Sequence, residues 1–159
     1  MDLKNPEYVQ GHGLIKGRSV LITAAAGAGI GFSAAQRAAD EGARDIVLSD
    51  IQEGRLQAAV EKLKQESGLQ DVWGKVGNVA VEDDVRALVD FAEDKLGGTD
   101  ILINNAGLGT SKLLIEMEDD EWHKVIDVTL NGTMRRTRYM MKVMKQREKG
   151  GVIVNNASV

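Results

Sequence analysis

A cluster of glycines lies near the amino terminus, where residues 27–31 read Gly-Ala-Gly-Ile-Gly. It follows an apolar run at 20–23, typical of a buried strand, and precedes an alanine-rich helical pattern at 32–41. A glycine turn between a strand and a helix lets the backbone approach a pyrophosphate closely, and the helix end offers free N–H groups and a partial positive charge. The cluster departs from G-x-G-x-x-G because position 32 is Phe, and glycine clusters also form plain tight turns. The turn is therefore a candidate phosphate site that needs support from other residues.

Asp50 gives that support. It lies nineteen residues after Gly31, at the end of a second apolar run, residues 46–50. A carboxylate at this point can accept hydrogen bonds from both ribose hydroxyls of an adenosine and would repel a 2′-phosphate. The glycine turn contains no Lys or Arg. The pattern favours NAD(H) over NADP(H) as cofactor, against the alternative that Asp50 is a solvated residue at the start of a loop.

Five apolar runs of strand length alternate with helical patterns along the chain. Strands are expected at 20–23, 46–50, 71–76, 100–104 and from residue 151 onward, and helices at 32–41, 53–67, 82–96 and 118–149. This alternation predicts an α/β fold, a Rossmann-like doubly wound parallel sheet with strand order 3-2-1-4-5. Such a sheet places a cofactor in the crevice between strands 1 and 4, at their carboxyl ends. Polar residues and Gly132 weaken the last helix around 129–133, so we expect a bend or a local irregularity there.

The domain organisation follows from the same pattern. Residues 1–17 form an N-terminal arm punctuated by Pro6 and three glycines. Residues 18–159 form a single dinucleotide-binding domain that we expect to be incomplete at its carboxyl terminus, with the last strands of the sheet missing.

Composition narrows the class of protein. The chain has 43% hydrophobic and 28% charged residues and a net charge of −4, which is ordinary for a globular domain and does not suggest a nucleic-acid surface. It has no cysteine, and His12 and His123 have no second ligand nearby, so no metal site is proposed. No signal peptide and no apolar run long enough to span a membrane is present, which favours a cytoplasmic protein.

Three motifs together carry a family resemblance. They are the run from Thr23 to Gly31, the Asn-Asn-Ala-Gly sequence at 104–107, and the strand that delivers Ser158. With these motifs the chain resembles the short-chain dehydrogenase/reductase family from about Leu14 to Val159. A narrower likeness is to a subgroup linked to actinobacterial steroid and acyl-CoA breakdown.

The resemblance assigns roles to residues. It implies that Ser158 is the catalytic serine, which hydrogen-bonds the substrate carbonyl or alcohol. Asn78 stands where the family usually has an Asp beside the adenine, and its amide is expected either to accept from the adenine amino group or to form a turn. The residues implied to bind the cofactor are Thr23, Ala25, Gly27, Gly29, Ile30, Gly31, Asp50, Asn78, Val79, Asn105, Ala106 and Gly107.

The chain departs from the family pattern at three places. The glycine turn is one residue longer, with Ala in place of its first glycine, and Thr129 occupies the position of an active-site Asn. Asn131 is not expected to replace that Asn, because residues two apart on a helix point in different directions. The family's Tyr-x-x-x-Lys is absent, since Tyr8 and Tyr139 lack a Lys four residues on. We therefore expect the 159 residues alone to be inactive.

The resemblance predicts an NAD(H)-dependent oxidoreductase that interconverts a secondary alcohol and a ketone, with a steroid-derived or acyl-CoA substrate. The alternative is a non-catalytic dinucleotide-binding or assembly module. The methionines of the 118–149 helix, and its other apolar residues, favour a homo-oligomer that pairs through this helix, and the resemblance implies a tetramer. Arg135, Arg136 and Arg138 are interpreted as a solvated face of the same helix.

Overall fold

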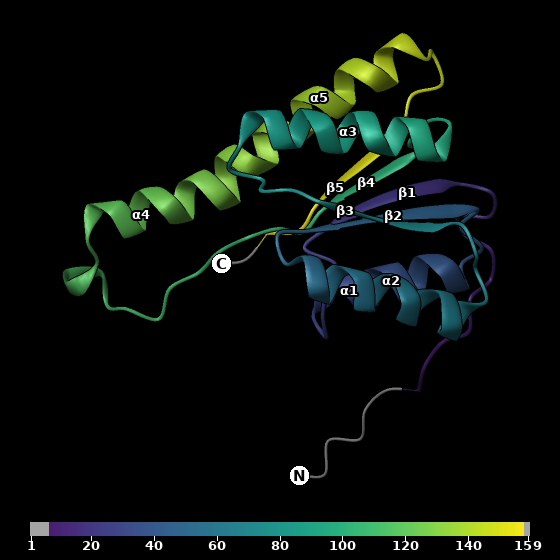
Figure 1. Ribbon diagram of the computed structural model, residues 1–159, viewed down its shortest axis with the longest axis horizontal. Helices are drawn as coiled ribbons and strands as arrows, with labels where there is room; N and C mark the ends of the chain where they lie inside the picture. The colour runs from purple at the N-terminus through teal and green to yellow at the C-terminus, as the bar shows by residue number, and fades with distance from the viewer. Residues whose placement is uncertain (1–6, 158–159) are drawn as a thin grey trace.

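The computed structural model describes residues 7–157 and contains one parallel sheet of five strands in the order β3-β2-β1-β4-β5 (Figure 1). The strands are β1 (Ser19–Thr23), β2 (Asp45–Asp50), β3 (Val72–Val76), β4 (Ile101–Asn104) and β5 (Val152–Asn155). All four pairings between neighbouring strands are parallel. The predicted fold class and strand order are therefore confirmed.

Helices cover both faces of this sheet (Figure 1). On one face lie α1 (Ile30–Asp40) and α2 (Glu53–Ser67), and on the other lie α3 (Glu82–Leu96) and α5 (Gly132–Gln146). Strand β1 shows why both faces must be covered. Ile22 packs into the hydrophobic core beneath α1 and α2, and Leu21 packs into the core beneath α3 and α5. Alternate residues of a central parallel strand point to opposite faces, which explains its uninterrupted apolar sequence.

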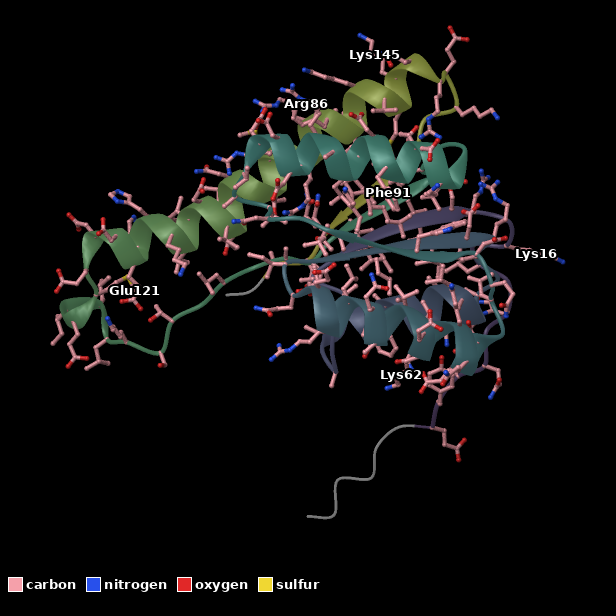
Figure 2. All side chains as sticks on the ribbon, viewed as in Figure 1. Lys16, Lys62, Arg86, Phe91, Glu121 and Lys145 are labelled. Atoms are coloured by element: carbon pink, nitrogen blue, oxygen red, sulfur yellow. The ribbon has the colours of Figure 1, made fainter. Side chains whose placement is uncertain are left out.

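The predicted irregularity in the last long helix is present as a π-helical segment. Helix α4 (Asp119–Ile126) continues through this segment (Asp127–Asn131) directly into α5. Helix α4 and the loop before it project beyond the sheet (Figure 1). Glu121, labelled in Figure 2, fastens the loop to α4 by pairing with Lys112 at 2.6 Å and by accepting from the Thr110 hydroxyl at 2.7 Å.

Residues 7–18 precede β1 and are attached to the carboxyl end of α1. The Glu41 carboxylate accepts hydrogen bonds from the backbone N–H of His12 at 3.0 Å and of Leu14 at 2.9 Å, and it pairs with Arg37. These contacts, the Leu14 N–H first, lower the pKa of Glu41 to about 2 although burial opposes the shift. Residues 1–6 of the predicted arm lie outside the described residues, and the domain boundary at residue 17 stays a prediction.

Candidate functional site

The glycine turn joins β1 to α1 and leaves an open cradle at the start of the helix. Gly29 is the N-cap of α1 and makes no side-chain cap hydrogen bond. A Cβ added at Gly27 or Gly29 would meet no described atom within 4 Å, so there is free space beside the turn. The N–H groups in the first turn of α1, which begins at Ile30, are therefore available to an anion. This arrangement fits a pyrophosphate group.

Gly31 packs this turn tightly against the sheet. A Cβ at this position would lie 2.3 Å from the Ala24 carbonyl oxygen and 2.7 Å from Asn105 Nδ2, so only glycine fits. Ala24 itself has a φ of 50°, a left-handed conformation that costs about 1–2 kcal/mol for a residue with a Cβ. The backbone strain of the lengthened turn is thus located at Ala24.

Asp50 ends β2 beside the turn. Its Oδ2 accepts from the Ala26 N–H at 3.2 Å, and its Oδ1 accepts from the Gln52 N–H at 3.0 Å. These two backbone donors orient the carboxylate in the wall of a cavity of about 320 Å³. Each carboxylate oxygen can accept a further hydrogen bond, as a pair of ribose hydroxyls would require.

Five of the predicted cofactor residues line this cavity. They are Asp50, Asn78, Val79, Ala106 and Gly107. The sequence reasoning missed the other lining residues, which are Ala24, Ser49, Ile51, Gly77, Ala80, Leu108, Lys124, Asp127 and Val128. Helical spacing of three and four residues places the last three members of this list on one face, but that spacing alone does not indicate a cavity. The Ser49 hydroxyl is buried and has no hydrogen-bond partner in the described part of the chain.

Asn78 forms a turn, which was one of its two expected roles. Its Oδ1 accepts from the Ala80 N–H at 3.0 Å, and its own N–H donates to Asp84 at 2.9 Å. Because the Ala80 N–H can only donate, the Asn78 side chain must turn its oxygen, and not its NH₂ group, toward Ala80. The Asn78 NH₂ group makes no hydrogen bond to any residue between 7 and 157, and it remains available to a ligand in the cavity.

Other predicted cofactor residues lie beneath the cavity and connect the strands. The Thr23 hydroxyl accepts from the N–H groups of Asn105 and Ala106 at 3.1 and 3.2 Å. Asn105 Nδ2 donates to the carbonyls of Thr23 and Ala24, and its Oδ1 accepts from Asn156 Nδ2 at 2.8 Å. Ala25 is buried behind the turn. The structure thus brings Thr23 and Asn105 together, but as supports of the cavity rather than as its lining.

Asn104 is the centre of a second polar cluster, on the α5 side of the sheet. Its Oδ1 accepts from Arg136 Nε at 2.7 Å, and its Nδ2 donates to Asn155 at 2.9 Å and to Thr137 at 3.1 Å. The interpretation of Arg136 as part of a solvated face is wrong, because its side chain is fully buried. Arg136 shares an inward stripe with Met140 and Met144, spaced four residues apart, and this spacing was the signal in the sequence.

Thr129 lies in the π-helical segment and binds the loop that follows β4. Its hydroxyl donates to the Leu108 carbonyl at 3.1 Å and accepts from the Leu108 N–H at 3.0 Å. Asn131 donates to Asp127 at 3.1 Å. Both polar groups are engaged with neighbouring residues, and the expectation that Asn131 does not take the place of the family's Asn stays a prediction.

A second cavity of about 270 Å³ lies on the other side of the glycine turn. Gly27 and Ala28 line it together with Arg55 and Lys62 of α2. Figure 2 labels Lys62, which lies 4.8 Å from the Phe32 ring centroid. The glycine turn itself has no cation, but the fold brings these two cations next to it.

Two further expectations concern catalysis and metals. Ser158, the predicted catalytic serine, lies outside the described residues. Within the described part of the chain, no cluster of His, Asp and Glu is arranged to hold a metal ion, and no helix is long and apolar enough to cross a membrane.

Known proteins resemble this chain over nearly its whole length. A family model of short chain dehydrogenases matches residues 18–159. A Mycobacterium tuberculosis protein named (5R,7aS)-5-hydroxy-7a-methyl-1-oxo-2,3,5,6,7,7a-hexahydro-1H-indene-carboxyl-CoA reductase is 45% identical over 154 residues, 97% of this chain and 58% of its own. The 3beta-hydroxysteroid dehydrogenase 2 of Eggerthella lenta is 38% identical over 147 residues, 92% of this chain and 55% of its own.

Solved structures agree with this relationship. A short chain dehydrogenase from Mycobacterium smegmatis matches 98% of this chain and 64% of its own, with a TM-score of 0.94 and 46% identity. L-sorbose reductase of Gluconobacter frateurii, complexed with NADPH and L-sorbose, has a TM-score of 0.83 at 35% identity, over 91% of this chain and 54% of its own. A short-chain dehydrogenase/reductase from Burkholderia phymatum in complex with NAD matches 90% of this chain and 50% of its own, at 32% identity.

The chain spans between a half and two thirds of the length of these relatives. The part it shares with them contains the open glycine turn, Asp50 and the Asn-Asn-Ala-Gly motif. Because the family model, the sequence identities and the fold all agree, the chain belongs to the short-chain dehydrogenase/reductase family.

Proposed function

We propose that the chain is the cofactor-binding part of an NAD(H)-dependent oxidoreductase that interconverts a secondary alcohol and a ketone. The observation that carries this proposal is the open glycine cradle at the start of α1 beside the oriented carboxylate of Asp50. Phosphate and ribose sites at this spacing suit the adenosine half of a dinucleotide.

The glycine turn and the residues of the cavity beside it suit successive parts of that cofactor. Gly27 and Gly29 give the pyrophosphate access to the backbone, and Asp50 accepts from the ribose hydroxyls. Asn78 and Val79 border the base, and Ala106 and Gly107 border the nicotinamide side. The bound nicotinamide supplies the hydride chemistry, while the protein binds and orients the reactants.

The preference for NAD(H) rests on charge. The Asp50 carboxylate in the cavity wall would repel a 2′-phosphate at the same ribose. Arg55, across the glycine turn, is one of the two cations with which such a phosphate could pair, the other being Lys62. We propose that repulsion at Asp50 outweighs attraction by Arg55, because Asp50 is held by two backbone donors whereas Arg55 is exposed.

We further propose a cyclic ketone or alcohol as substrate, either steroid-derived or joined to coenzyme A. The names of two relatives, an indene-carboxyl-CoA reductase and a hydroxysteroid dehydrogenase, support this substrate class. In this proposal Ser158 orients the substrate oxygen. Proton transfer would need the Tyr and Lys of the family motif, and neither Tyr8 nor Tyr139 has the required Lys.

Assembly into a homo-oligomer is part of the same proposal. Trp122, Leu130, Met134 and Met141 expose between 46% and 62% of their surface along α4, the π-helical segment and α5. A second copy packed on this row would remove a contiguous apolar surface from water, which stabilises association by about 25 cal/mol per Å².

Spectrophotometric assay of NADH oxidation tests the proposed reaction. A purified protein that contains these 159 residues together with the family's Tyr-x-x-x-Lys should oxidise NADH when fused-ring ketones or their CoA thioesters are present. The 159 residues alone should not. NADH binding without turnover of any ketone or alcohol by the longer protein would contradict the proposed reaction and favour a binding module. Turnover by the 159 residues would contradict the expected need for Tyr and Lys.

A further inference from the structure

Arg136 is a fully buried cation whose charge is not balanced by a carboxylate. No Asp or Glu oxygen among residues 7–157 lies within 4.0 Å of its guanidinium, whereas Arg135 and Arg138 on the same helix both pair with Glu82. Burial lowers the pKa of Arg136 to about 10, so the group stays protonated at neutral pH. An unpaired buried charge costs several kcal/mol of desolvation. A structural role alone would be served more cheaply by an apolar side chain.

The guanidinium bonds the end of β4 and its own helix, and it lies close to a third segment. Its Nε donates to Asn104 at the end of β4, and its Nη2 donates to the Thr133 hydroxyl at 3.3 Å. Its Nη1 is buried without a partner. A Cβ at Gly132 would lie 3.3 Å from this Nη1 and 3.0 Å from the Val79 carbonyl oxygen, so the guanidinium lies close to the loop that borders the cavity.

Arg136 also determines the orientation of two amides. A guanidinium has only donors, so Asn104 must turn its oxygen toward Arg136. The Asn104 NH₂ then donates to Asn155 Oδ1, at the end of β5 and three residues before Ser158. One buried donor therefore sets the hydrogen-bond direction from α5 through β4 to β5.

We propose that Arg136 is a positioning residue that holds the carboxyl ends of β4 and β5, beside the 77–80 loop, in the arrangement that binds the dinucleotide. This inference rests on the proposed function, since it assumes that the cavity binds NADH. It extends the proposed function, because it assigns the geometry of the site to a residue that touches neither cofactor nor substrate.

Arg136→Met separates positioning from stability. The substitution removes an unpaired buried charge, which offsets the lost hydrogen bond to Asn104, so the thermal midpoint should not fall. Leaving the Asn104 oxygen without its donor frees the amides of Asn104 and Asn155 to rotate. We therefore expect the NADH dissociation constant to rise about tenfold.

Two further variants control the experiment. Arg136→Lys retains a buried donor that can reach Asn104, and it should restore the dissociation constant to within about threefold of the unaltered protein. Arg138→Met removes a half-exposed Arg on a different face of the same helix. This variant should leave NADH binding unchanged. All dissociation constants are measured by NADH fluorescence well below the lowest thermal midpoint, so that only folded protein is compared.

The outcomes separate this inference from the proposed function. Weaker binding by Arg136→Met with recovery in Arg136→Lys supports the positioning role. Equal NADH binding by the unaltered protein and Arg136→Met overturns it, as does failure of Arg136→Lys to recover binding while it folds normally. Absence of NADH binding by the unaltered protein would instead contradict the proposed function.

Discussion

At the scale of single residues, the cavity presents a mixture of acceptors and donors to the adenosine half of the proposed cofactor. Asp50 offers carboxylate oxygens, while Asn78 offers its NH₂ group because its oxygen is held by the Ala80 N–H. A donor at this point suits a ring nitrogen or a keto oxygen of the base better than an amino group. The side chain of Asn78 therefore bears on which base the site prefers.

The Asn78→Asp variant should sharpen the preference for adenine. A carboxylate accepts from the 6-amino group of adenine and repels the 6-keto oxygen of hypoxanthine, so the ratio of the two dissociation constants should rise about tenfold. Fluorescence titration with NADH and reduced nicotinamide hypoxanthine dinucleotide measures this ratio. Gln70→Glu, the same type of change in an exposed loop, is the control. An unchanged ratio in Asn78→Asp would show that the base does not contact this side chain.

Residues differ in how far their roles could be predicted from the sequence. Asp50 could be located because its role depends on its distance along the chain from the glycine turn. Arg136 could not be placed by its residue type, because charged side chains are usually solvated and only its spacing from Met140 and Met144 indicated burial. Ser49 and Lys124 line the cavity because strands and helices far apart in sequence meet there.

At the scale of elements, the alternation of strands and helices was sufficient to predict the sheet order. Strands β1 to β4 are short and each is followed by a helix, and right-handed crossovers leave few other arrangements. The π-helical segment was predictable only as an irregularity. In the structure the Thr129 hydroxyl of this segment binds the Leu108 backbone in the loop after β4, a contact that the local sequence does not indicate.

The packing of α1 onto the sheet should fail in Gly31→Ala. The new Cβ would lie 2.3 Å from the Ala24 carbonyl oxygen, so the turn must shift, and we expect a loss of about 1–3 kcal/mol of unfolding free energy together with weaker NADH binding. Gly54→Ala is the matched control, since its Cβ would meet nothing within 4 Å in α2. The unfolding free energy of Gly54→Ala should rise by about 0.5–1 kcal/mol. Urea denaturation measures both, and equal stability of the two variants would contradict the close approach at Gly31.

The contact between residues 12–14 and α1 should depend on pH through Glu41. Its pKa falls from 4.5 to about 2 on folding, so its stabilising contribution is complete above pH 4.5 and is lost as pH falls toward 2. Thermal midpoints of the unaltered protein should exceed those of Glu41→Gln at neutral pH and converge with them between pH 4.5 and 2. Glu61→Gln, at an exposed position, serves as control. A constant difference down to pH 2 would refute the role of this carboxylate.

At the scale of the whole molecule, apolar side chains are exposed on one surface of the α4–α5 segment. Met134→Glu and Met141→Glu would each place a charge in the proposed interface, where an unpaired charge is costly. Light scattering should show one discrete oligomer for the unaltered protein and smaller species for these variants. Gln146→Glu, also exposed on α5, should leave the assembly intact. A monomeric unaltered protein would contradict the proposed interface.

The account depends most on dinucleotide binding beside Asp50, and NADH and NADPH titrations of the purified protein test this directly. Repulsion between charges about 4 Å apart is worth about 1–4 kcal/mol, so NADH should bind about tenfold or more tightly than NADPH. Asp50→Ala should reduce this preference, and Asp71→Ala, at an exposed site, should not. Tighter binding of NADPH, lost in Arg55→Ala, would contradict the account and assign the 2′-phosphate to the second cavity.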